Sequence, residues 1–118
     1  MVKLTKKQEL LVIASSHFSK WDNCESDWDF APVTIYQDVF DKSIVEVLIR
    51  SHKADTNELK LIAFATFKPK NKNFYKFNCR QGYLVDKKGN IVGNQKIEPF
   101  EDKFLAEAVC KYLTKQEK

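Results

Sequence analysis

The chain of 118 residues contains only three glycines and three prolines, and it has no long apolar run. A membrane-spanning helix needs about 20 consecutive apolar residues, whereas the apolar run at residues 10–14 has five. The isolated glycines exclude a glycine-rich phosphate loop. Because 43% of the residues are hydrophobic and few are breakers, a disordered chain is excluded as well. We therefore expect a single folded, soluble domain over residues 1–118, with no membrane partner.

Cysteine is also scarce, and its three positions share no short spacing: Cys24, Cys79 and Cys110. An odd, widely spaced set excludes both a disulfide framework and a zinc site built from paired ligands. We expect reduced thiols and a cytoplasmic location. Cys79 is expected on the inward face of its strand, and Cys110 lies beside Val109 on the expected C-terminal helix, which favours buried, inert thiols.

The residues that are present predict helices at both ends of the chain. Thr5 and Gln8 form a capping box, and apolar residues then recur every three or four positions, which predicts a helix that ends near Lys20. Pro99 opens a second segment with a broad apolar face, which predicts a C-terminal helix.

Between these helices the apolar period changes to two, which predicts strands. The expected fold class is α+β: an N-terminal helix, an antiparallel meander of about four strands after a short leading one, and a C-terminal helix, with both helices packed on one sheet face. Residues 22–32 are expected to be irregular, a bulge is expected at Gly82, and Gly89 is expected to supply the positive φ of a hairpin. The expected strands cover residues 33–35, 45–49, 59–68, 74–85 and 91–97.

The inward phase of these periods predicts the core. The side chains expected to be nearly inaccessible are Phe18, Val47, Leu61, Ala63, Phe77, Leu105 and Val109. The segment around Ile62 and Phe64 is apolar on both sides, which is typical of a central strand.

Charge is segregated along the chain. Residues 22–58 hold nine acidic and three basic residues, a net charge of −6, whereas residues 60–96 hold nine basic residues and one acidic residue, a net charge of +8. Such asymmetry is typical of a partner-binding face, although the two segments can also neutralise each other in the fold.

The stretch at residues 67–77 interleaves cations with aromatic rings, which is what a surface for single-stranded nucleic acid needs. Strand alternation places Lys76 and Arg80 on one face, and it places Tyr75 and Phe77 on the opposite face, where they would instead belong to the core. Lysines of this kind also keep sheet edges soluble. The partner-binding residues expected here are Lys68, Lys70, Lys72, Tyr75, Lys76 and Arg80.

A second candidate surface is the acidic-aromatic stretch at residues 21–30. Trp28 and Phe30 would anchor a partner protein within a ring of carboxylates, or else fold onto the core. Oxygen ligands gather there, but the stretch lacks the glycine and the closing glutamate of a calcium loop, so no metal site is expected.

Catalytic motifs are absent. His17 lies on the apolar stripe of the first helix, and His52 lies near Asp55 with no serine or cysteine nucleophile beside it. We therefore expect no catalytic residue and no cofactor. The expected function is that of a non-catalytic binding or regulatory protein, whose partner is a protein or nucleic acid with an anionic surface. The alternatives are a small enzyme or ligand-binding fold with a pocket between helices and sheet, and a single-stranded nucleic-acid or RNA-binding module.

Overall fold

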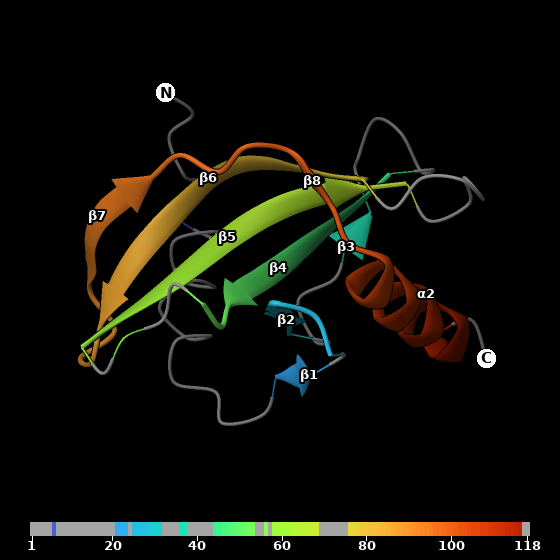
Figure 1. Ribbon diagram of the computed structural model, residues 1–118, viewed down its shortest axis with the longest axis horizontal. Coiled ribbons are helices and arrows are strands. Elements are labelled where there is room, and N and C mark those ends of the chain that lie inside the picture. Colours follow the sequence, from blue (N-terminus) through green and yellow to red (C-terminus); the bar gives the residue numbers. More distant parts are fainter. Residues whose placement is uncertain are drawn as a thin grey trace.

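The computed structural model of the protein describes residues 6, 21–23, 25–31, 36–37, 44–53, 56, 58–68 and 76–116. In these residues the chain forms eight strands and one helix (Figure 1). In chain order the elements are β1 (Asp22–Asn23), β2 (Trp28–Phe30), β3 (Tyr36–Gln37), β4 (Val45–Ser51), β5 (Leu59–Phe67), β6 (Lys76–Asp86), β7 (Ile91–Gln95), β8 (Phe100–Glu101) and α2 (Lys103–Gln116).

The expected α+β layout with two helices is wrong for this part of the chain, which is mostly antiparallel sheet with one C-terminal helix. The helix predicted up to Lys20 lies outside the described residues except for Lys6. Residues 22–32, predicted to be irregular, contain β1 and β2. Strands of two and three residues are too short to show a period in the sequence. They form here because β2 pairs with β4 on one side and with β1 on the other.

The main sheet has the strand order β1-β2-β4-β5-β6-β7, and each of these neighbours is antiparallel. The central strand is β5, which pairs with β4 on one side and with β6 on the other. Two consecutive residues of β5, Ile62 and Ala63, point to opposite faces of the sheet, and both are fully buried. The prediction that this strand is buried on both faces is confirmed.

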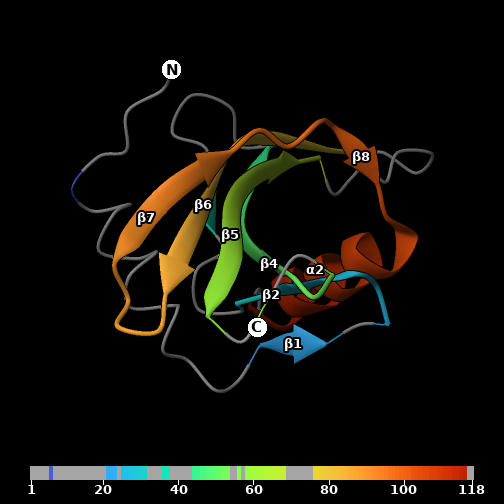
Figure 2. The same cartoon turned by 60° about the vertical axis from the view of Figure 1, so that its left-hand side comes forward.

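The sheet is strongly curved, and α2 packs against its concave side (Figure 2). The β5–β6 pairing changes register after Phe64. Phe64 pairs with Gln81 and the next residue, Ala65, pairs with Cys79, so Arg80 is an extra residue in β6. A second shift lies between Leu84 and Val85 in the β6–β7 pairing. Extra residues of this kind bend a strand and increase its twist. The expected bulge is therefore present, but two residues before Gly82.

Every inward residue predicted from the strand and helix periods that the structure describes is buried, and all of them except Leu61 belong to the helix-facing core. Val47, Ala63, Phe77, Leu105 and Val109 are all fully buried, and Leu61 is 2% exposed. Phe18 lies outside the described residues. The opposite, convex face of the sheet carries a second cluster, made of Leu48, Ile62, Phe64, Tyr83 and Val85, with Trp21 and Ile91 packed against it.

Local hydrogen bonds fix the ends of β6 and α2. Asp86 Oδ1 accepts hydrogen bonds from the backbone N–H groups of Lys88 and Asn90, both at 2.9 Å, and Gly89 has φ 88°, as predicted for this hairpin. The helix begins at Lys103 rather than at Pro99, because Asp102 Oδ1 accepts the Leu105 N–H at 2.9 Å and caps it. No helix within the described ranges, α2 included, is long and apolar enough to cross a membrane.

Candidate functional site

The predicted basic residues that the structure describes lie together at one end of β5 and β6. Lys68 follows β5, Lys76 is the first residue of β6, and both are exposed. Thr66 pairs with Asn78, so two further steps along the ladder place Lys68 opposite Lys76. Both lie on the convex face, and we call them the lysine pair.

The remaining predicted basic residues are not brought into this pair by the described structure. Lys70, Lys72 and Tyr75 lie outside the described residues. Arg80 belongs to β6, but the register shift falls at this residue. The alternation from Lys76 runs as far as Cys79, and the extra residue interrupts it at Arg80, so the expectation that Lys76 and Arg80 share a face stays a prediction.

The aromatic rings nearest the lysine pair belong to the core. Phe67 is 3% exposed and Phe77 is fully buried, and their rings stack with centroids 4.7 Å apart. Both point toward α2, away from the lysines. They therefore offer no stacking surface for a nucleic-acid base.

The predicted aromatic anchors of the acidic stretch also turn inward. Phe30 is fully buried in the helix-facing core, which agrees with the alternative that this ring folds onto the core. Trp28 is half-buried, and it stacks on Phe100 with centroids 5.1 Å apart and an interplanar angle of 7°. Phe100 stacks in turn on Phe77 at 5.4 Å, so the rings of Trp28, Phe100, Phe77 and Phe67 form a continuous row.

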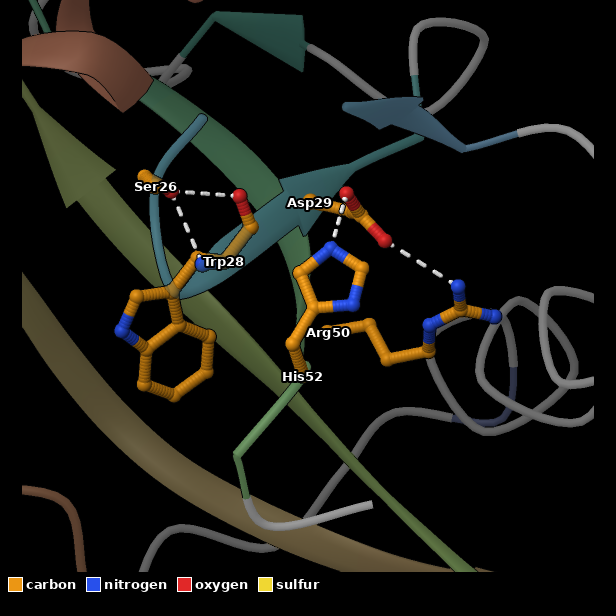
Figure 3. A network of polar contacts seen from close by, with 5 residues as sticks. All are labelled: Ser26, Trp28, Asp29, Arg50 and His52. Carbon is orange, nitrogen blue, oxygen red and sulfur yellow. Dashed lines mark hydrogen bonds and ion pairs between the residues drawn. The ribbon is translucent and has the colours of Figure 1, made fainter. Parts of the chain in front are cut away.

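A polar network that the sequence did not reveal joins β2 to the end of β4 (Figure 3). Its centre is Asp29, whose carboxylate is 2% exposed. Arg50 donates through Nη2 to Asp29 Oδ2 at 3.0 Å, and His52 Nε2 lies 2.7 Å from Asp29 Oδ1. The guanidinium carbon of Arg50 lies 4.9 Å from the centre of the Trp21 ring, which is within the range of a cation–π contact.

Neighbouring contacts hold the loop that carries Asp29. Ser26 Oγ accepts the Trp28 N–H at 2.8 Å and donates to the Trp28 carbonyl oxygen at 2.6 Å. The His52 N–H donates to the Asp27 carbonyl at 2.8 Å, and Lys53 Nζ lies 2.9 Å from Asp27 Oδ2. Side chains and backbone together therefore fix the loop against the end of β4.

The register of β2 on β4 explains why sequence reasoning missed this network. Asp29 lies directly opposite Arg50 and diagonal to His52, although 21 and 23 residues separate them in the chain. The local candidate partner of His52, Asp55, lies outside the described residues. The one available signal was the alternation Trp28-Asp29-Phe30, which places a carboxylate between two inward-facing rings.

The cysteines that the structure describes carry no site. Cys79 and Cys110 are free thiols packed against the helix-facing core, and Cys24 lies outside the described residues. Burial raises the pKa of the Cys79 thiol to about 12, and burial followed by the charge of Glu107 raises the pKa of Cys110. A protonated thiol is a poor nucleophile. No cluster of three metal-ligating side chains occurs in the described part of the chain.

Comparison of the chain with protein-family models, with curated proteins and with solved structures gives no match.

Proposed function

We propose that the protein is a binding or regulatory protein that docks onto an acidic protein surface through the lysine pair. The observation that supports this proposal is that β5 and β6, which pair as far as Thr66 and Asn78, have two exposed lysines, Lys68 and Lys76, at this end. Like charges directly opposite each other across a ladder destabilise a sheet. Lys76 also pairs across β6 and β8 with Glu101, but neither lysine forms an ion pair with any residue that the structure describes. A carboxylate-rich partner would place anionic groups within reach of both lysines.

The net charge of the surrounding sequence also favours an acidic partner. Residues 60–96 carry a net charge of +8, and they include β5, β6 and β7. In the described part of this region, Asp86 is the only acidic residue. A surface of one sign accelerates association with a partner of the opposite sign and makes it sensitive to salt.

A protein partner is favoured over single-stranded nucleic acid because of the buried rings. Binding of single strands relies on aromatic side chains that stack with bases. Phe67 and Phe77 are buried in the core, so neither of these two rings is available to stack with a base. The reduced thiols of Cys79 and Cys110 support a cytoplasmic setting for this function.

The test compares an acidic polypeptide, polyglutamate, with mixed-sequence single-stranded RNA as ligands of the whole chain. We expect binding to polyglutamate that weakens as salt is added. The double variant Lys68→Glu, Lys76→Glu should abolish this binding. The matched control is Lys111→Glu, Lys115→Glu, which makes the same charge change at exposed positions of α2 and should retain more of the binding.

Two results would contradict the proposal. Equal loss of binding in both double variants would mean that net charge, and not the lysine pair, attracts the ligand. Tighter binding of RNA than of polyglutamate, lost only in the Lys68→Glu, Lys76→Glu variant, would replace the protein partner with a nucleic acid. Circular dichroism of each variant establishes that the fold is intact before binding is compared.

A further inference from the structure

The network around Asp29 contains more than a cross-strand ion pair requires. A buried carboxylate needs a positive partner and hydrogen bonds to remain charged. Arg50 supplies both at Asp29 Oδ2. The second oxygen is nevertheless occupied as well, by the imidazole of His52 at 2.7 Å. The side chain of Asp29 is 2% exposed, whereas the His52 side chain that it contacts is 39% exposed.

The contact with Asp29 determines which ring nitrogen of His52 faces away from the network. Nε2 points at Asp29 Oδ1, and Nδ1 lies on the part of the ring turned away from that oxygen (Figure 3). A carboxylate accepts hydrogen bonds, so in the neutral imidazole the proton resides on Nε2 and the lone pair on Nδ1. Within the described residues, no hydrogen bond engages Nδ1.

This arrangement has the parts of a general base. A positioned imidazole with a carboxylate on its far nitrogen is held in one tautomer and one orientation, and the carboxylate stabilises the imidazolium that forms when the free nitrogen takes a proton. We propose that His52 and Asp29 form an acid–base site, in which His52 Nδ1 activates water toward the carbonyl of a small neutral ester. In this site His52 is the catalytic residue and Asp29 is a positioning residue.

Two further observations select water and a neutral substrate. No serine, threonine or cysteine side chain in the described part of the chain is hydrogen-bonded to His52, so none of these side chains is in place to act as the nucleophile, and water takes that role in the proposed site. Among the described residues, the ion pairs beside the ring are balanced in charge, because Arg50 faces Asp29 and Lys53 faces Asp27. A site with no net local charge does not favour a charged substrate over a neutral one.

The proposed step conserves atoms and charge. The water oxygen forms a bond to the ester carbonyl carbon while His52 Nδ1 takes a proton from that water. The bond between the carbonyl carbon and the alkoxy oxygen then breaks, and the imidazolium returns its proton from Nδ1 to the leaving oxygen. The products are a carboxylic acid and an alcohol, and the Nε2 proton stays with His52, hydrogen-bonded to Asp29, throughout.

The first test measures hydrolysis of ethyl dichloroacetate by the whole chain. We expect His52→Gln to lower the protein-dependent rate about 100-fold, the lower limit for a positioned general base. The matched control is His17→Gln, which changes the other histidine of the chain and should leave the rate unchanged. Equal rates for the native chain and for His52→Gln would overturn the proposal.

The second test reads the proton position without relying on activity. In the native chain, ¹⁵N chemical shifts of the labelled His52 ring should show the proton on Nε2. The variant Asp29→Asn should shift the ring toward the other tautomer and lower the hydrolysis rate at least about tenfold, because an amide no longer demands a donor. A native ring with its proton on Nδ1 would exclude this site even if Asp29→Asn fails to fold.

Discussion

The side chain of Ile97 lies directly over the backbone of Gly82. A β-carbon placed on Gly82 would stand 2.7 Å from Ile97 Cδ1 and 2.9 Å from both the Gln95 carbonyl oxygen and Leu61 Cδ1. The segment after β7 therefore covers the middle of β6 closely enough that only hydrogen fits at this position. Gly82 thus allows a close approach of two backbones in the curved part of the sheet.

We predict that Gly82→Ala destabilises the fold by about 1 to 3 kcal/mol, as overpacking of a filled interior does. The Gln95 contact is with backbone, which cannot move aside as a side chain can. The matched control is Gly93→Ala, whose β-carbon would meet Leu84 Cδ1 at an ordinary 3.5 Å. Urea unfolding of both variants measures the difference, and equal midpoints would contradict this account of Gly82.

The second prediction concerns the row of stacked rings. Phe77 is fully buried between Phe67 and Phe100. We expect Phe77→Ala to lower the free energy of unfolding by about 3 to 5 kcal/mol, because it removes buried area and leaves a cavity. Phe104→Ala, at a ring that is 49% exposed, should change it by less than about 1 kcal/mol. Thermal or urea unfolding tests both, and a similar loss in each would show that burial does not decide the cost.

The third prediction separates the buried ion pair from an exposed one. Asp29→Asn should cost about 3 to 5 kcal/mol, because it removes the buried carboxylate that pairs with Arg50. Asp27→Asn breaks the pair with Lys53, whose side chains are 56% and 76% exposed, and should cost less than about 1 kcal/mol. Unfolding midpoints in low and high salt provide the measurement. A cost for Asp29→Asn as small as that for Asp27→Asn would mean that the network contributes little to stability.

The fourth prediction concerns alkaline pH. Burial raises the pKa of the Cys79 thiol from 9.0 to about 12 in the folded chain, so between these values the unfolded chain has lost a proton that the folded chain keeps. The contribution of Cys79 to stability is therefore complete below pH 9 and is lost as pH rises from 9 toward 12. Cys79→Ala should flatten the fall in unfolding free energy between pH 8.5 and 10.5, relative to the native chain.

The matched control for this pH dependence is Cys110→Ala, since the pKa of Cys110 is raised in the same direction with a smaller contribution from burial. It should flatten the curve less than Cys79→Ala does. If the native chain and Cys79→Ala lose stability in parallel over this range, the Cys79 thiol is not protected from ionisation by the fold.

Sequence periodicity predicted those parts of the fold in which one face of an element is buried over several turns or alternations. The inward phase of β4, β5 and α2 was correct because Val47, Ala63 and Val109 belong to long runs that repeat the same pattern. The hairpin at Gly89 was correct because a turn with a positive φ has a local chemical requirement.

The candidate site was not predictable in the same way, because it depends on register. Asp29 belongs to a strand of three residues, and its partners become neighbours only when β2 pairs with β4. Likewise, the register shift at Arg80 could not be predicted from the alternation that precedes it in β6, because an extra residue changes the pattern only after it occurs. Strand pairing between residues far apart in the chain produces no periodic pattern in the sequence, and neither does the position of a bulge.

The short strand β8 has a consequence for the order in which the chain assembles. Gly82 pairs with Gln95 and Phe77 with Phe100, five residues further along each strand, so β8 continues the path of β7 beside β6 (Figure 1). Helix α2 begins two residues after β8. The β6–β7 hairpin closes a short loop and can form early, whereas the helix reaches the concave face only after β8 has docked. Contacts made by α2 then form late, so Val109→Ala should mainly accelerate unfolding and leave the folding rate nearly unchanged in stopped-flow measurements.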